Sequence, residues 1–107
     1  MILGQYVVIT GHGGPKNALY FIFDPESRSF SNAFIGTHLV WQYDDLSTAA
    51  YVDGSNILSI DGRTLAELDL AENEYVYGLS YSQDGTVLTA TIVSSEETER
   101  IVRLTLP

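Results

Sequence analysis

The chain has 107 residues and a net charge of −9, from 14 acidic and 5 basic side chains. This length predicts one domain, and a hydrophobic fraction of 45% predicts a folded domain with a core. The excess of carboxylates argues against binding to nucleic acids or anionic membranes, since both require cationic side chains on the protein.

The sequence contains no cysteine, which favours the cytoplasm over an oxidising compartment. The N-terminal stretch "MILGQYVVIT" lacks the basic region of a secretory signal. No apolar run reaches the roughly 18 residues that a membrane-spanning helix needs. We therefore expect a single cytoplasmic domain.

The pattern along the chain predicts β structure throughout. Short runs of β-branched and aromatic residues alternate with turn residues such as Gly, Asp, Asn, Pro and Ser. The predicted strands, in chain order, are 5–10, 18–23, 29–35, 38–43, 47–52, 56–60, 64–70, 75–82, 86–93 and 99–105. Ten short strands joined by short turns predict an all-β, antiparallel meander.

One segment, "TLAELDLAEN" at 64–73, also fits a helix, because Thr64 and Glu67 have the spacing of a capping box. An internal repeat favours a strand instead. The stretch "YFIFDPESRSFSNAFIG" from Tyr20 resembles "NILSIDGRTLAELDLAE" from Asn56, and "SFSNAFI" is a poor helix former. As a strand, the segment places Leu65, Glu67 and Asp69 on one face, and its carboxylates point to solvent. Thr64, Ala66, Leu68 and Leu70 lie on the other face.

The second copy of the repeat, Ile57 to Val93, contains the hairpin "YSQDGTVLTAT". Its S-x-D-G turn and four-strand length resemble a blade of a β-propeller. Two or three blades do not close a ring, which usually needs at least four. A small sandwich or partial barrel is therefore the preferred architecture, and the alternative is a partial propeller that assembles with copies of itself through edge strands.

Motifs for catalysis or cofactor binding are incomplete. "HGGP", His12 to Pro15, resembles the oxyanion-hole loop of some serine hydrolases, but the G-x-S-x-G elbow of that class is missing. His12 is expected to be an exposed loop residue and His38 a hydrogen-bonded edge residue, not an acid–base pair. The pairs Asp44–Asp45 and Glu72–Glu74 would hold calcium only loosely. We expect no enzyme activity, cofactor or metal.

Aromatic residues form two rows at equivalent places in the repeat. Strand alternation places Leu39, Trp41 and Tyr43 on one face of the first. It places Tyr75, Tyr77, Leu79 and Tyr81 on one face of the second. Both rows are expected in the core, and the alternative is that the tyrosines and the tryptophan near the row ends are exposed.

Exposed aromatic residues beside carboxylates suit an interface with a basic protein. The expected contact residues are Trp41, Tyr43, Asp44, Asp45, Glu67, Asp69, Glu72, Glu74, Tyr75, Tyr77 and Asp84. The surface around residues 67–74 is completed either by Glu96, Glu97 and Glu99 or by Asp44 and Asp45.

A small, acidic, cysteine-free β domain is similar in character to bacterial immunity proteins. This resemblance implies that the chain neutralises a basic toxin of the nuclease type by covering its cationic active site. The alternative function is a self-assembling, propeller-like scaffold or ligand-binding module.

Overall fold

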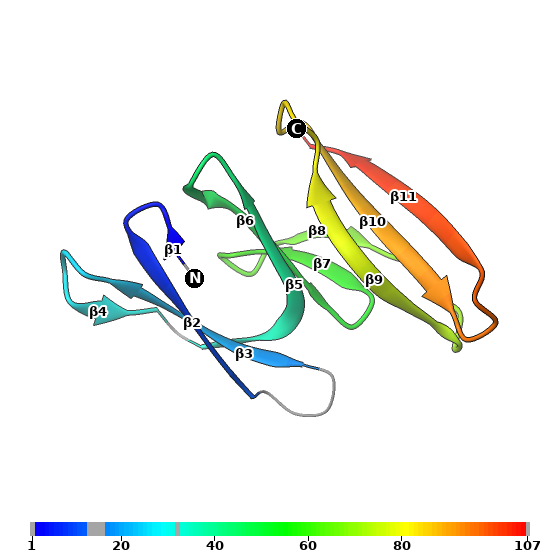
Figure 1. Ribbon diagram of the computed structural model, residues 1–107, viewed down its shortest axis with the longest axis horizontal. Coiled ribbons are helices and arrows are strands. Elements are labelled where there is room, and N and C mark those ends of the chain that lie inside the picture. The colour runs from blue at the N-terminus through cyan, green and yellow to red at the C-terminus, as the bar shows by residue number, and fades with distance from the viewer. Residues whose placement is uncertain (1, 13–16, 32, 107) are drawn as a thin grey trace.

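The computed structural model describes residues 2–12, 17–31 and 33–106, and these form an all-β protein (Figure 1). The described residues include no helix, so none is available to span a membrane. The strands are β1 (Ile2–Leu3), β2 (Tyr6–His12), β3 (Ala18–Asp24), β4 (Ser29–Phe30), β5 (Phe34–Gln42), β6 (Asp45–Asp53), β7 (Asn56–Ser59), β8 (Thr64–Glu67), β9 (Glu74–Tyr81), β10 (Val87–Ser94) and β11 (Glu99–Thr105).

The strands pair as an antiparallel meander in two sheets. The larger sheet has the order β1-β2-β3-β5-β6-β7-β8, with β4 paired to β3. The smaller sheet has the order β11-β10-β9. The predicted all-β meander is confirmed. Both sheets are open, so the described strands form no closed barrel.

The strands are arranged in three consecutive layers (Figure 1). We call β1–β4 the N-terminal layer, β5–β8 the middle layer and β9–β11 the C-terminal layer. One core cluster lies between the N-terminal and middle layers and includes Leu3, Val8 and Ile22. A second cluster lies between the middle and C-terminal layers and includes Ile57 and Ile92. The middle layer is therefore covered on both faces.

The residues of β6 explain how this layer is buried on both sides. Four consecutive residues, Ala49 to Val52, are buried. Ala49 contributes to the first core cluster, whereas Ala50 and Val52 contribute to the second. An uninterrupted buried run is typical of a strand covered on both faces, while a half-exposed strand alternates apolar and polar residues.

The two copies of the sequence repeat follow the same succession of strands. In the first copy β3 pairs with β4, and β5 then forms a hairpin with β6. In the second copy β7 pairs with β8, and β9 then forms a hairpin with β10. The copies differ in one respect: β3 also pairs with β5, whereas β7 and β8 lie in the larger sheet and β9 and β10 in the smaller one.

The helical alternative for residues 64–73 is wrong, because β8 pairs with β7 through Asn56 and Glu67. Glu67 and Asp69 are exposed, as predicted. The strand is shorter than predicted and ends at Glu67. Leu65 packs against the second core cluster, contrary to the predicted alternation. The β7–β8 register shifts between Ile57 and Leu58, which breaks that alternation.

The predicted strand at 29–35 is divided between two strands. β4 covers only its first two residues, and β5 begins at Phe34. Ser31 ends the pairing: its backbone N–H donates to the carbonyl of Ile22 at 2.8 Å. Its Oγ accepts from the Ile22 N–H at 3.0 Å.

The aromatic row of β9 does not share one face. Tyr75 and Tyr77 are 53% and 66% exposed, whereas Leu79 is buried. In the pairing with β10, Gly78 lies opposite Thr91 and Val76 lies opposite Ile92. Tyr77 is therefore the extra residue of a β-bulge, which reverses the alternation on either side of it.

The row of β5 is also divided. Leu39 and Trp41 pack, partly buried, against the first core cluster. Tyr43 lies beyond the end of the strand with φ 54° and is 73% exposed. The expectation that both rows belong to the core is wrong for all three exposed tyrosines: Tyr43, Tyr75 and Tyr77.

Candidate functional site: an acidic end and an adjoining groove

The predicted contact residues fall into two groups at opposite ends of β9. One group surrounds the β5–β6 and β9–β10 turns, which touch each other. The Tyr43 hydroxyl donates to the carbonyl of Gln83 at 2.6 Å, and the Gln42 amide donates to the same carbonyl at 3.2 Å. The other group lies in the first half of β9 and in the connections beyond it, and Glu74 is roughly 23 Å from the far end of this eight-residue strand, which rises about 3.3 Å per residue.

At the first end, two carboxylates accept hydrogen bonds from residues of their own turns. Asp84 accepts hydrogen bonds from the Ser82 hydroxyl at 2.7 Å and from the Thr86 hydroxyl at 2.8 Å. These bonds hold the pKa of Asp84 at about 2. Asp45 accepts from the backbone N–H and hydroxyl of Ser47, at 3.0 and 2.8 Å. Asp84 and Asp45 therefore have local structural partners.

At the second end, three connections meet: the β6–β7 turn, the segment 68–73 and the β10–β11 turn. The backbone N–H of Ser95 donates to the carbonyl of Asn73 at 2.9 Å, and that of Leu68 donates to the carbonyl of Ser55 at 2.6 Å. We call the exposed carboxylates of these connections and the adjoining strand ends the acidic end. They are Asp53, Glu67, Asp69, Glu72, Glu96, Glu97 and Glu99.

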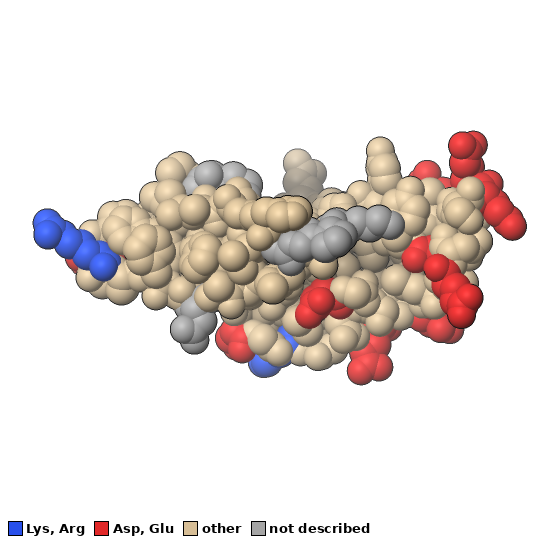
Figure 2. Space-filling model, turned by 90° about the horizontal axis from the view of Figure 1, so that it is seen from below, with Lys and Arg blue, Asp and Glu red and all other residues tan. Residues whose placement is uncertain are grey.

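Figure 2 shows acidic side chains gathered toward the end of the molecule that the C-terminal layer forms. The sequence left open which carboxylates complete the surface around residues 67–74. The structure brings Glu96, Glu97 and Glu99 beside residues 69–73. It places Asp44 and Asp45 at the far end of β9. Sequence reasoning missed Asp53, although the "DGSN" turn that follows β6 marks its position.

Glu74 differs from the exposed carboxylates of the acidic end because it is paired with an arginine of the chain. The Arg100 guanidinium contacts both of its carboxylate oxygens, at 2.8 and 3.1 Å. The backbone N–H of Ala71 donates to Glu74 at 2.8 Å. Together they lower the pKa of Glu74 to about 2, the Arg100 hydrogen bonds making the largest contribution. Glu74 therefore orders the acidic end.

A groove of about 820 Å³ adjoins the acidic end, between β5 and the start of β9. Its lining includes His38, Leu70, Tyr75, Val76 and Tyr77. His38 has a φ of 57°, and its Nδ1 atom is buried with no hydrogen-bond partner among the described residues. The expectation of a hydrogen-bonded edge histidine is wrong at this atom, because β5 breaks its pairing with β6 between Thr37 and Val40.

The other candidates from the sequence do not converge on this groove. His12 is exposed at the end of β2, as predicted. Residues 13–16, with most of the "HGGP" stretch, lie outside the described residues. Within the described ranges, no three His, Asp or Glu side chains come close enough together to hold a metal ion.

Comparison with protein-family models, curated protein sequences and solved structures found no match to this chain. The acidic end and its groove are therefore interpreted from their own chemistry.

Proposed function

We propose that this chain is a non-enzymatic binding protein whose acidic end contacts a basic protein. More specifically, we propose an immunity or inhibitor protein that covers the cationic site of a basic toxin, such as a nuclease. The observation that carries this proposal is the gathering of seven exposed carboxylates beside Tyr75 and Tyr77, which are 53% and 66% exposed. No family assignment contributes to it.

Electrostatics give this arrangement a physical advantage. Carboxylates concentrated at one end repel one another, and a cationic partner relieves that repulsion as it binds. The same field steers a basic protein toward the acidic end before contact. Exposed tyrosines add aromatic surface whose removal from water on binding is favourable. Aromatic residues of this kind often dominate binding energies.

The contact surface proposed here differs from the sequence-based set. It keeps Glu67, Asp69, Glu72, Tyr75 and Tyr77, and it adds Asp53, Glu96, Glu97 and Glu99. It leaves out Trp41, which packs against the first core cluster. It also leaves out Glu74, Asp45 and Asp84, whose carboxylates already have internal partners. Tyr43 and Asp44 are exposed but lie at the far end of β9.

Neutralising the acidic end is expected to weaken binding to a basic nuclease. The test variant is Glu72→Gln/Glu96→Gln, and the matched control is Glu26→Gln/Asp44→Asn, whose exposed carboxylates lie elsewhere. Each double variant removes two negative charges from a net charge of −9. We expect the test variant to bind about fivefold more weakly at low salt, from two surface charge pairs of roughly 0.5 kcal/mol each.

The measurement is affinity and inhibition against a panel of purified basic nucleases, at low and high salt. The control should bind within about twofold of the parent chain, because screened distant charges contribute little. Equal weakening by both variants would show that only net charge matters. Failure to bind or inhibit any basic nuclease at low salt would contradict the proposal.

A second candidate function, self-assembly, is favoured by the outer face of the N-terminal layer. Ile9 and Phe30 are 42% and 60% exposed there, and Ile35, at the start of β5 where it pairs with β3, is 47% exposed. Phe30 also contacts Phe21 and Phe23, with ring centroids 6.5 and 4.8 Å apart. A contiguous exposed apolar patch commonly marks an interaction surface.

We propose a second copy of this chain as the occupant of this face. The layers already pack face to face within the molecule, and the same packing between two N-terminal layers continues that arrangement. A two-fold contact between identical faces is the commonest oligomer geometry. The acidic end belongs to the opposite side of the molecule, so two such chains approach through their less charged layers (Figure 2).

Phe30→Ser is expected to dissociate this dimer, with a dimer dissociation constant at least tenfold higher than that of the parent chain. In a two-fold dimer the substitution removes the aromatic ring of Phe30 from both copies, so two contacts are lost. The control is Ile101→Ser, on the C-terminal layer, where the side chain is 51% exposed. Analytical ultracentrifugation over a concentration series measures the effect. A parent chain that stays monomeric throughout the series would exclude this second candidate.

A further inference from the structure

We infer that the groove between β5 and β9 binds a guanidinium group, the side chain of an arginine supplied by the basic partner. The inference rests on the proposed function and specifies how that partner is recognised. It starts from the geometry of the groove, which has an apolar floor and an aromatic rim and is also lined by His38. Val52, Leu70 and Val76 contribute apolar surface, and Tyr75 and Tyr77 contribute exposed rings.

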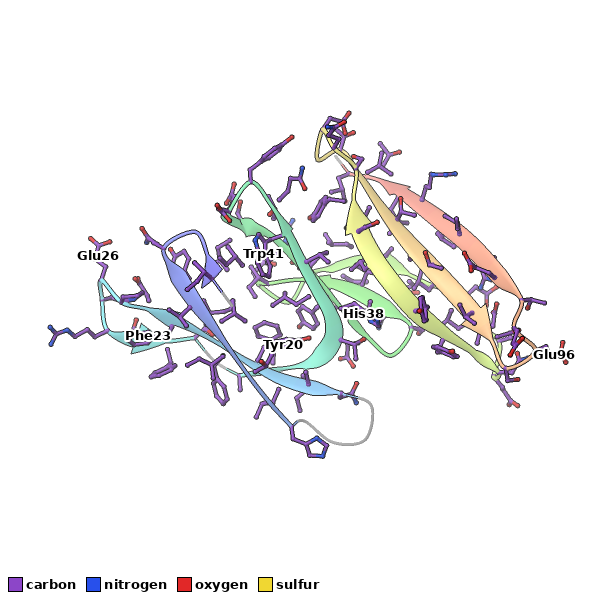
Figure 3. The ribbon with its side chains drawn as sticks, in the orientation of Figure 1. Tyr20, Phe23, Glu26, His38, Trp41 and Glu96 are labelled. Carbon is purple, nitrogen blue, oxygen red and sulfur yellow. The ribbon has the colours of Figure 1, made fainter. Side chains whose placement is uncertain are left out.

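His38 supplies a polar group. Figure 3 shows His38 on the side of β5 that faces the C-terminal layer, whereas Trp41 points toward the N-terminal strands. The buried Nδ1 atom of His38 has no partner in the described part of the chain. A buried polar atom without a hydrogen bond is unfavourable, and His38 lines the groove, so a turn of its ring toward the groove would give Nδ1 a donor there. An imidazole nitrogen without a proton accepts a hydrogen bond from an N–H donor.

The backbone is irregular on both sides of the groove. His38 adopts a left-handed φ of 57°, which L residues rarely do, and β5 breaks its pairing at the same place. On the opposite side, the bulge of β9 turns Tyr77 outward. Bulges re-aim side chains and occur preferentially beside functional sites. Two independent irregularities therefore meet at one groove.

Negative charge beside the groove favours a cationic ligand, although Glu74 in the lining is itself paired with Arg100. Asp53 precedes the lining residue Gly54, and Asp69 precedes the lining residue Leu70; both carboxylates are exposed. The neighbouring Arg100 shows that a guanidinium is accommodated at this end. It contacts both oxygens of Glu74 and donates to the carbonyl of Asp69.

Arginine fits this groove better than lysine. A guanidinium is planar and stacks on aromatic rings, and it donates N–H groups in several directions at once. Its plane can lie against Tyr75 or Tyr77, and one N–H can bond to His38 Nδ1 once the imidazole ring turns toward the groove. The remaining N–H groups point toward the carboxylates of the acidic end. A lysine ammonium has no planar face that could stack on the tyrosine rings.

The test is a titration of the full chain, followed by heteronuclear NMR, with N-acetyl-argininamide as the probe. N-acetyl-citrullinamide is the matched control, because it has the same length with a neutral urea in place of the guanidinium. We expect saturable shifts of the backbone signals of residues 37–38 and 75–77 with the arginine probe. We expect the citrulline probe to bind at least fivefold more weakly.

Two substitutions localise the binding. Tyr77→Ala and His38→Asn are each expected to weaken binding of the arginine probe about threefold or more. Asn is chosen because it tolerates positive φ better than most residues. Tyr43→Ala is the control, since Tyr43 is 73% exposed at the far end of β9, and it should leave the affinity unchanged. The parent-like spectrum of each variant confirms that it is folded.

Equal binding of the two probes, or no saturable shift, would overturn the guanidinium site. If Glu72→Gln/Glu96→Gln still weakens nuclease binding in that case, the proposed function stands without this groove. If the arginine probe binds here but no basic nuclease binds the chain, the groove stands and the proposed function fails.

Discussion

Replacing Ile92 by alanine is expected to lower the free energy of unfolding by about 2–5 kcal/mol. Ile92 lies in β10 and is fully buried. It belongs to the core cluster that joins the middle and C-terminal layers. Removing its side-chain carbons loses the free energy of burying them and leaves a cavity that rigid strands on both sides fill only partly. Urea denaturation measures the change.

The matched control is Ile101→Ala, in the adjacent strand β11. Ile101 is 51% exposed and lies opposite Thr91 in the pairing of β10 with β11. The same atoms are removed from the same sheet, but from its open face, so we expect a change within about 0.5 kcal/mol. Equal losses at the two positions would mean that the C-terminal layer does not pack against the middle layer as described.

Gly36→Ala is expected to destabilise the fold by about 1–3 kcal/mol through overpacking. A Cβ atom at Gly36 would lie 2.5 Å from the carbonyl oxygen of Val52 and 2.5 Å from the Cδ2 atom of Tyr51. The carbonyl belongs to β6, which pairs with β5 through Thr37 and Val52. The ring is in contact with Phe34, with centroids 4.7 Å apart. Relief of the clash therefore requires β5 and β6 to separate.

The control for this change is Gly78→Ala, in β9. A Cβ atom at Gly78 would meet no heavy atom within 4 Å. Because glycine costs more chain entropy than alanine on folding, this substitution should be neutral or stabilising by up to about 1 kcal/mol. Chemical denaturation of both variants decides the point. A loss at Gly78 as large as that at Gly36 would contradict the steric explanation.

Local chemistry explains why the strands were predictable. Turn residues such as Asp84 and Gly85 end one strand and begin the next, and the structure shows the Asp84 carboxylate bonded to Ser82 and Thr86 in that turn. The internal repeat resolved the one segment that also fits a helix. The two-residue strand β1 was missed, since a pair of apolar residues carries no periodicity.

The candidate site was only partly predictable, because two of its features depend on pairing between strands. Alternation along β9 fails at Tyr77, where a bulge relative to β10 turns the ring outward. No local sequence pattern indicates the left-handed backbone of His38, because this conformation accompanies the register shift of β5 against β6. The approach of Asn73 to Ser95 joins segments 22 residues apart and follows from the sheet topology.

The last strand, β11, pairs with β10 on one side, and its other side is the open edge of the smaller sheet. Unpaired edges recruit other strands and so seed aggregation. This edge carries Glu99, Arg100 and Arg103, all exposed. An incoming strand would have to desolvate these charges, which disfavours ribbon-like stacking of chains. The charges on β11 thus protect an edge that would otherwise be open to extension by another strand.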